Sequence, residues 1–265
     1  MKIGIDAGGT LTKVAYVDGD YRRFEKWKST DVDTLIKMID SQYPQDEVFL
    51  TGGKAEYMAE KLNRNHGVSI EFDATYRGLK TLMAEQGIAL ERFVYLNVGT
   101  GTSFHHASSK GQKRVGGSGV GGGTLLGLSK LLVGIDDYNK IIHLADTGNR
   151  DAIDLKVHHI YNGRPTPIPG DLTASNFGNV ISGDIESLEP ADKLQAVIGL
   201  VAETVTAIGI NLAEGYDTKD IVFIGSTLFD NKVMQEIINR YAGLKGAKAH
   251  IIDNGEYSGA LGAIL

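Results

Sequence analysis

The sequence predicts a two-lobed α/β fold with a cleft between the lobes, in which each lobe is a β-meander followed by alternating helices and strands. At 265 residues, the chain is near the size at which one hydrophobic core gives way to two. The same order of patterns, strands first and then alternating helix and strand, occurs twice along the chain. Glycine is abundant, with 34 residues against 5 prolines, which suits tight turns and close backbone approaches.

The first lobe is predicted over residues 1–70. Its strands are apolar or alternate between apolar and polar residues, and its helices follow the 3.6-residue period. A tight "GGT" turn joins the first two strands, so the lobe begins as a meander. In order, the predicted elements are the strands "KIGIDA", "TKVAYVD" and "YRRFEKWKS", the helix "DVDTLIKMIDSQ" capped by Asp31, the strand "EVFLTGG" and the helix "AEYMAEKLNRN".

The second lobe is predicted over residues 71–265, and a strand "VSIEF" with a helix beginning near Ala74 leads into it. A long helix over residues 190–214 is apolar on more than one face, which indicates burial against both the core and a neighbouring element. The other elements are, in order, two strands in "RFVYLNVGTGTSFHHAS", a strand, glycine loop and helix in "QKRVGGSGVGGGTLLGLSKLL", a mostly helical stretch over residues 136–161, the loop "NGRPTPIPGD", and then the strand "DIVFIGS", the helix "NKVMQEIINRYA", the strand "AHIID" and the helix "GALGAIL".

The two lobes correspond in pattern rather than in identity. "IGIDAGGT" matches "YLNVGTGT", and "VFLTGGKA" matches "IVFIGSTL", in the same order. Buried strands that end in glycine are common in α/β proteins, so either pair alone also arises by chance. The two pairs together indicate a duplicated topology.

Composition excludes several classes of protein. There is no cysteine, which rules out a disulfide framework, a thiolate nucleophile, a cysteine-bound zinc and a cysteine-held iron–sulfur cluster, and which is consistent with a reducing cytoplasm. The net charge of -6 gives no general attraction to nucleic acid or to an anionic membrane. The chain opens directly on a strand pattern, and no apolar run approaches the length of a membrane span. A cytoplasmic protein without a nucleic-acid or membrane partner is predicted.

The turn from Asp6 to Thr10 is the first candidate site. Glycines between two strands let the backbone aim its N–H groups at an anion. A carboxylate that ends an apolar strand is costly to bury unless it is paired or helps to hold a cation. Asp6 is therefore either an Asx-turn cap or a group that holds Mg²⁺ through water, because Mg²⁺ dehydrates reluctantly. Lys13 either reaches the phosphates or faces solvent.

Three later glycine-containing segments extend this interpretation. In "NVGTGTS", the hydroxyls of Thr100, Thr102 and Ser103 suit phosphate oxygens, although an ordinary hairpin has the same pattern. "GGSGVGGGTLLGL" is either a flexible linker or a phosphate- and ribose-binding loop, and it runs directly into an apolar helix whose N-terminus attracts anions. "VFIGST" ends a buried strand in Gly225 and Ser226, where a flat base can approach the backbone.

The candidates for the reaction centre are Glu71 and Arg114. In "SIEFDA", Glu71 and Asp73 are predicted to share one face at the end of a strand. Asp73 is the predicted cap of the next helix, which leaves Glu71 as a general base or a surface acid. Arg114 is a substrate-binding and charge-stabilising group or a surface arginine. His105 and His106 point to opposite faces of a strand, so they predict no metal site.

The chain resembles the actin-like ATPase and sugar-kinase superfamily, whose fold is ribonuclease H-like. The features that carry this resemblance are the acidic glycine hairpin, the second Gly/Thr turn, the late strand–Gly–Ser element and the duplicated meanders. Within this superfamily, "GIDAGGTLTK", "EFDA", "NVGTGTS", "RVGGSGVGGGT", "DLTASNFG" and "VFIGST" resemble the type II pantothenate kinases of staphylococci and related Gram-positive bacteria. The resemblance implies MgATP-dependent phosphorylation of the 4′-hydroxyl of pantothenate, the first step of coenzyme A synthesis, by a homodimer.

The resemblance also implies a role for each matched residue. Glu71 would be the catalytic base, Arg114 would bind substrate and stabilise transferred charge, and Thr102, Thr173 and Tyr241 would lie near the pantothenate, the last two at or beside the subunit interface. The implied ATP site consists of Asp6, Ala7, Gly8, Gly9, Thr10, Leu11, Thr12, Lys13, Thr100, Gly122, Gly123, Thr124, Leu125, Leu126, Tyr138 and Ser226, with Asp6 serving Mg²⁺ through water.

Two other functions are compatible with the same turns. One is a kinase for a sugar or amino sugar, although many of these use an aspartate base after a different motif. The other is an ATP-driven conformational switch, such as a chaperone-like ATPase or a dehydratase activator. The activator would need cysteines for its cluster, and a chaperone would need a peptide-binding domain for which the chain has no length.

Overall fold

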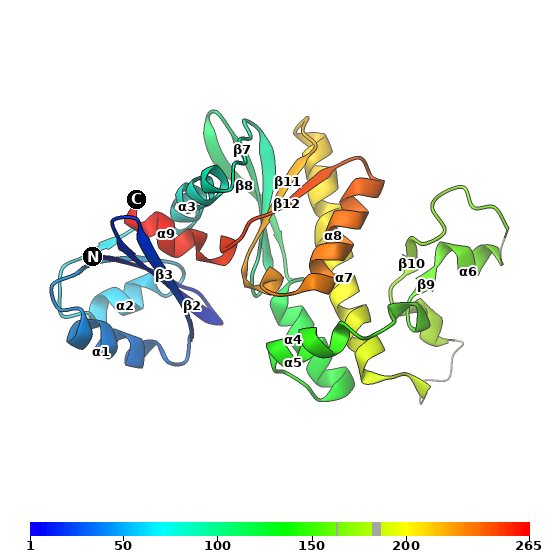
Figure 1. The fold of residues 1–265 in the computed structure, drawn as a ribbon, viewed down its shortest axis with the longest axis horizontal. Coiled ribbons are helices and arrows are strands. Elements are labelled where there is room, and N and C mark those ends of the chain that lie inside the picture. The colour runs from blue at the N-terminus through cyan, green and yellow to red at the C-terminus, as the bar shows by residue number, and fades with distance from the viewer. Residues whose placement is uncertain (163, 182–186) are drawn as a thin grey trace.

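The computed structural model describes residues 1–162, 164–181 and 187–265, and it contains two five-stranded sheets with helices packed on them (Figure 1). The strands of the first sheet all come from the first part of the chain. They are β1 (Lys2–Ala7), β2 (Leu11–Asp18), β3 (Tyr21–Lys28), β4 (Glu47–Thr51) and β5 (His66–Val68), with α1 (Val32–Gln42) and α2 (Ala55–Lys61) between them.

The second sheet and its helices make up most of the remaining chain. Its strands are β6 (Phe93–Val98), β7 (Thr102–Ser108), β8 (Gly111–Ser118), β11 (Asp220–Ile224) and β12 (Lys248–Ile251). The main helices are α3 (Glu71–Glu85), α4 (Gly122–Val133), α5 (Tyr138–Ala145), α7 (Pro190–Gly215), α8 (Lys232–Leu244) and α9 (Ser258–Ile264). A separate arm carries β9 (Leu155–Lys156), α6 (Val157–Tyr161) and β10 (Thr173–Ser175), and the described short 3₁₀ turns are η1 (Arg150–Ala152), η2 (Gly178–Ile181), η4 (Ser226–Leu228) and η5 (Gly255–Tyr257).

The two sheets have the same topology. The first has the strand order β3-β2-β1-β4-β5, with an antiparallel meander followed by two parallel pairings. The second has the order β8-β7-β6-β11-β12, again with an antiparallel meander followed by two parallel pairings. β1 therefore corresponds to β6 and β4 to β11, which confirms the duplicated topology predicted from the paired sequence patterns.

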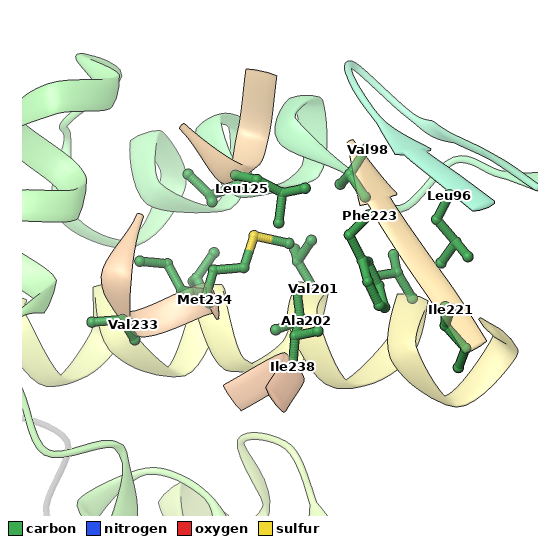
Figure 2. Packing of buried hydrophobic residues seen from close by; sticks show 14 of the residues in the cluster. Leu96, Val98, Leu125, Val201, Ala202, Ile221, Phe223, Val233, Met234 and Ile238 are labelled. Atoms are coloured by element: carbon green, nitrogen blue, oxygen red, sulfur yellow. The ribbon is translucent and has the colours of Figure 1, made fainter. Parts of the chain in front are cut away.

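Each sheet is stabilised by its own hydrophobic core. α1 and α2 cover one face of the first sheet. The largest core lies between the second sheet and α4, α5, α7 and α8, and Figure 2 shows side chains of β6 and β11 packing against α7 and α8 there, among them Leu96, Phe223, Val201, Ala202, Met234 and Ile238. Of the described helices, α7 alone has the length and apolarity of a membrane span, but 61% of its most apolar window is buried. α7 is a core helix, as its apolar pattern predicts.

The chain ends on the lobe where it began. α9 lies beside β1 in the first lobe and packs closely against α3 (Figure 1). A Cβ added to Gly262 would lie 1.8 Å from the carbonyl oxygen of Ala74, and one added to Gly78 would lie 2.0 Å from that of Ser258. The two helices therefore approach at a distance that only glycine permits. The division at residue 70 stays a prediction, but the α3–α9 pair joins the two sheets.

We expect Gly262→Ala to destabilise the protein, because the new methyl group meets the backbone of α3 rather than a movable side chain. The expected loss in the free energy of unfolding is about 1–3 kcal/mol, the usual scale of overpacking. Gly243→Ala on α8 is the matched control, because a Cβ there meets nothing within 4 Å. Urea denaturation measures both. Equal midpoints for the two variants would contradict the close packing of α3 and α9.

The secondary structure predicted on either side of residue 70 is wrong. β5 ends at Val68 and α3 begins at Glu71, so "VSIEF" is not a strand and the helix does not begin near Ala74. The side chain of Ile70 is 71% exposed, so the local alternation marks no buried strand face. On a helix, residues two apart point about 200° apart, so Glu71 and Asp73 do not share a face. Asp73 does not cap α3; its Oδ1 accepts a hydrogen bond from Gln112 Nε2 at 3.2 Å.

Two smaller expectations also change, and a third falls partly outside the described residues. The stretch over residues 136–161 contains α5, η1, β9 and α6 rather than mostly helix, because the chain turns there into the separate arm. Asp31 stands at the N-cap position of α1, but its side chain makes no cap hydrogen bond. The predicted proline-rich loop includes residue 163, which lies outside the described residues.

Candidate nucleotide and acceptor site

A cavity of about 510 Å³ lies where the two glycine turns face each other. The first lobe supplies side chains at the ends of β1 and β2, and the second supplies the start of α3, the β6–β7 turn and β8. The lining residues are Asp6, Gly8, Gly9, Lys13, Glu71, Phe72, Asn97, Gly99, Thr100, Gly101, Thr102, Ser103, Arg114, Gly117, Ser118 and Gly119. The cavity therefore brings together the first turn, the second turn and both predicted reaction-centre residues.

The tips of the two turns touch. The hydroxyl oxygens of Thr10 and Thr100 lie 2.8 Å apart, although 90 residues separate them in the sequence. Both side chains come from the glycine-containing hairpins that the sequence predicts to bind phosphate. An anion bound between the hairpins would be enclosed from both lobes.

Asp6 and Lys13 face each other inside the cavity. They are direct partners in the antiparallel pairing of β1 with β2, so their side chains share one face of the sheet. Lys13 Nζ lies 3.5 Å from Asp6 Oδ2, and both side chains are largely buried. A Cβ added to Gly259 would lie 2.9 Å from the same Asp6 oxygen, so α9 closes over this carboxylate. Lys13 thus faces the cavity rather than solvent.

The second turn is fixed to the first turn of α4 and to η4. Gly122 N–H donates to Gly99 O and Gly123 N–H donates to Thr100 O, both at 2.8 Å. Thr227 Oγ1 also donates to Gly99 O, at 3.1 Å. These two N–H groups of α4 therefore hold the turn that carries Thr100, and they are not free to bind a phosphate directly.

The other predicted ATP residues take different positions. Tyr138 donates its hydroxyl to Thr227 O at 2.7 Å and to Phe229 O at 3.1 Å, so it supports the turn that begins at Ser226. Gly225 has φ +115°, and a Cβ there would lie 2.4 Å from Val98 O, so only glycine fits at the end of β11. Leu125 is fully buried in the core, and Leu126 packs against it.

Several of the other first-hairpin residues predicted to bind ATP pack inside the protein. Ala7 and Thr12 are buried, and Leu11 is half-buried. The hydroxyl of Thr12 lies 3.4 Å from that of Ser29 on the neighbouring strand end. Thr124 Oγ1 donates to Gly119 O at 3.0 Å and accepts from Gly121 N–H, so it closes the glycine loop on itself.

Glu71 is the first residue of α3, and its carboxyl is accessible from the cavity. The surrounding protein raises the pKa of Glu71, first by excluding solvent and second through the nearby charge of Asp6, while Lys13 opposes the shift. A carboxylate with a raised pKa beside a cation is a suitable proton acceptor. The structure thus brings Glu71 into the cavity, although through a helix start rather than a strand end.

Arg114 lines the same cavity as Glu71 and lies near the ring of Phe72. Its guanidinium carbon lies 5.8 Å from the centroid of the Phe72 ring. A Cβ added to Gly117 would lie 2.6 Å from Arg114 Nη2, so the absence of a side chain at Gly117 leaves room for the guanidinium. Arg114 is exposed to the cavity, and no ion pair holds it among the described residues.

The three residues predicted to contact the substrate do not lie together. Thr102 lines the cavity, but its buried hydroxyl donates to Val120 O at 2.7 Å. Thr173 and Tyr241 line a separate groove of about 430 Å³ beside α6. In Figure 1, β9, β10 and α6 lie beyond α7 and α8, away from the β1–β2 hairpin. Within one chain, Thr173 and Tyr241 therefore line a groove that is separate from the cavity lined by Glu71.

Two features of the cavity escape sequence reasoning. Phe72 lies within ring-contact distance of both Arg114 and His105, and only its position beside Glu71 hints at a role. His105 is buried, stacks on Tyr95, and its Nε2 lies 3.0 Å from the Ser103 hydroxyl that lines the cavity. His106 instead stacks on Tyr216, so the two histidines do lie on opposite faces, as predicted.

The carboxylates of the cavity suit a metal held together with phosphate and water. Among the residues that the structure describes, no group of three or more His, Cys, Asp or Glu side chains could hold a metal by itself. Asp6 and Glu71 both line the cavity, and Asp6 lies beside the first turn. This donor set fits Mg²⁺, which keeps several waters and is bound through one or two carboxylates plus substrate phosphates.

Comparisons with known proteins find similar sequences over the whole chain. A type II pantothenate kinase from Staphylococcus epidermidis (strain RP62A) is 45% identical over 264 residues, covering 100% of this chain and 99% of that protein. A type II pantothenate kinase from Staphylococcus aureus (strain USA300) is 42% identical over 264 residues, covering 100% of this chain and 98% of that protein.

Solved structures show the fold. The (R)-2-hydroxyglutaryl-CoA dehydratase component A of Acidaminococcus fermentans aligns with TM-score 0.62 at 15% identity, over 99% of this chain and 95% of that one. A ROK family glucokinase from Streptomyces griseus in complex with glucose and AMPPNP aligns with TM-score 0.57 at 12% identity, over 99% and 97%. The predicted actin-like, two-lobed fold is therefore confirmed. The family model described as Fumble matches residues 20–265, and with the staphylococcal similarities it shows that this chain belongs to the Fumble family, among the type II pantothenate kinases.

Proposed function

We propose that this protein transfers the γ-phosphoryl group of ATP to the 4′-hydroxyl of pantothenate, the first step of coenzyme A synthesis, in the cytoplasm. The observation that carries the proposal is the single cavity that joins both glycine hairpins to Glu71 and Arg114. The names of the staphylococcal relatives supply the acceptor. The hairpins alone would be compatible with ATP-dependent phosphorylation of any small alcohol.

In this mechanism, Glu71 orients the primary hydroxyl of the acceptor and accepts its proton late. The acceptor oxygen forms a bond to the γ-phosphorus while the bond from that phosphorus to the bridging oxygen breaks, and ADP leaves. Phosphoryl transfer passes through a loose transition state, so the protein mainly positions groups and stabilises charge. Arg114, which no described ion pair occupies, is free to stabilise the transferred group.

The first hairpin, the second hairpin and Lys13 would hold the phosphates between the lobes. When bound, Mg²⁺ supplies positive charge to the phosphate oxygens. Asp6 would hold the water shell of that ion, and Lys13, 3.5 Å from Asp6, would add a second positive charge. Tyr138 and Ser226 would support the adenosine, Tyr138 by holding the turn after β11.

Thr173 and Tyr241 line a groove separate from the cavity, which favours a homodimer in which a partner subunit brings them to the acceptor. Their groove is bordered by apolar side chains that are largely exposed, with Ile160 at 55% and Ile168 at 51%. Apolar exposure of this kind is typical of a surface that another chain covers. Sedimentation velocity at assay concentrations tests this proposal, and a fully active monomer would contradict it.

One assay separates the candidate functions. Release of ADP is followed with pantothenate, with N-acetylglucosamine, with glucose and with no acceptor. We expect release only with pantothenate. Turnover only with a sugar would favour a sugar kinase, and ADP release without any acceptor would favour a conformational switch.

We expect the acid limb of kcat/KM to lie at higher pH than an ordinary glutamate would give. Glu71 must be ionised to accept a proton, and its surroundings raise its pKa above the usual value of 4.5. As pH falls through this raised pKa, Glu71 is protonated and activity is lost. Lys13 lowers the pKa, so Lys13→Met should move the limb further toward neutral pH. A limb that does not move in Lys13→Met would contradict this electrostatic arrangement.

A further inference from the structure

On the face of the first sheet that points away from α1 and α2, Lys26 of β3 lies in the same cross-strand row as two residues of the cavity. Asp6 on β1 is paired with Lys13 on β2, and Lys13 is paired with Lys26 on β3. Direct partners in an antiparallel pair project to the same face of a sheet. The three side chains therefore form one row across the meander. Asp6 and Lys13 line the cavity, whereas Lys26 is not among its lining residues.

Lys26 reaches the second lobe. Its Nζ lies 2.7 Å from Glu256 Oε1, and the Glu256 side chain is only 4% exposed. The same Nζ lies 3.4 Å from the centroid of the Phe229 ring. Phe24, two residues earlier on β3, stacks on Tyr257 with ring centroids 4.6 Å apart. β3 is thus docked by an ion pair, a cation–π contact and a ring stack.

The two partners of Lys26 belong to segments that matter for the nucleotide. Phe229 directly follows η4, the turn that begins at Ser226, and its carbonyl accepts a hydrogen bond from Tyr138. Glu256 lies in η5, where the chain passes from β12 of the second sheet to α9 on the first. Tyr138, in the second lobe, binds the backbone of this turn. Lys26, in the first lobe, contacts the ring of Phe229 at the end of the turn.

We propose that Lys26 is a positioning residue that couples docking of the first lobe to the order of the turn over residues 226–229, and so to the binding of ATP. The proposal rests on the proposed function, which assigns the adenosine to that turn. Lys26 does not line the cavity in which the phosphates and the acceptor are proposed to bind. It acts through Phe229 and Glu256.

Kinetics of three variants test the proposal. Lys26→Met keeps the aliphatic stem and removes the charge, Lys26→Arg keeps the charge, and Lys37→Met removes an exposed lysine of α1 as a control. We expect Lys26→Met to raise KM for ATP about tenfold, the scale of losing a partly desolvated charge contact, with KM for pantothenate changed less than about twofold. Lys26→Arg should recover most of the difference. Equal KM values for ATP in Lys26→Met and Lys37→Met would overturn the proposal.

A second comparison separates positioning from stability. Lys26→Met leaves the buried Glu256 carboxylate unpaired, so it should also lower Tm. The double variant Lys26→Met, Glu256→Gln removes that buried charge and should recover Tm. If KM for ATP stays raised in the double variant, Lys26 positions the turn. If KM for ATP returns to the wild-type value together with Tm, Lys26 is only structural.

ATP affinity gives a test that does not depend on the acceptor. Isothermal titration of ATP and Mg²⁺ into wild-type protein and Lys26→Met, with no pantothenate present, should show an approximately tenfold weaker affinity in the variant. Wild-type protein that binds ATP but does not phosphorylate pantothenate would contradict the proposed acceptor and leave this comparison valid. Equal affinities in the two proteins would contradict the role of Lys26 alone.

Discussion

Glu71→Gln should lower turnover by about 10²-fold or more, the usual scale of general acid–base catalysis, while ATP affinity stays near the wild-type value. The amide keeps the size of the side chain but cannot accept the hydroxyl proton. Glu71 lines the same cavity as Arg114 and Phe72, and no described hydrogen bond joins its side chain to the glycine hairpins that are proposed to bind phosphate. Steady-state ADP release measures kcat, and calorimetry measures ATP affinity.

Asp73→Asn is the matched control for this prediction. Asp73 lies two residues away on the first turn of α3, is exposed, and accepts a hydrogen bond from Gln112 that an asparagine oxygen can also accept. It should retain turnover within about threefold, since surface changes that preserve a hydrogen bond cost little. A Glu71→Gln protein with full turnover would remove Glu71 from the mechanism. Equal losses in both variants would indicate that the start of α3, rather than a base, is being disturbed.

Local patterns predict most of the framework. The apolar strand that meets Asp6, two glycines and a threonine is a hairpin in the structure, and its counterpart after β6 has the same form. These elements are predictable because tight turns depend on residues within a few positions of each other. The long apolar helix is also predictable, because a helix with apolar residues on several faces must be buried on several faces.

Contacts between distant segments are not predictable in this way. "SIEF" alternates like a strand, yet α3 begins there, because Ala74 and Gly78 must face α9, which lies at the other end of the chain. Asp73 is a residue type typical of helix N-caps, but its carboxylate accepts a hydrogen bond from Gln112 of β8 instead. Lys26 is one of many lysines in the sequence, and its ion pair with Glu256, 230 residues later, is visible only in the structure. Tertiary packing decides each of these cases.

The contact between Thr10 and Thr100 allows the two hairpins to be locked together. Their hydroxyl oxygens are 2.8 Å apart, and in a disulfide the two sulfurs are about 2.05 Å apart with Cβ atoms about 3.5–4.5 Å apart. The chain contains no cysteine, so a Thr10→Cys, Thr100→Cys variant has one possible intramolecular disulfide. We expect oxidation of this variant to lower turnover at least about tenfold, because in the proposed arrangement the nucleotide enters and leaves between the hairpins, and such opening commonly limits kcat.

Reduction with dithiothreitol should restore the activity of the double variant, which separates the effect of the crosslink from the effect of the substitutions. The single variants Thr10→Cys and Thr100→Cys are the controls, and oxidation should leave the turnover of each unchanged. Titration of free thiols before and after oxidation gives the fraction of crosslinked protein. A fully crosslinked enzyme that turns over as fast as its reduced form would show that the hairpins need not separate. Failure of the two thiols to pair under oxidation would contradict the contact of the two hairpins in solution, and with it the proposed enclosure of the phosphates from both lobes.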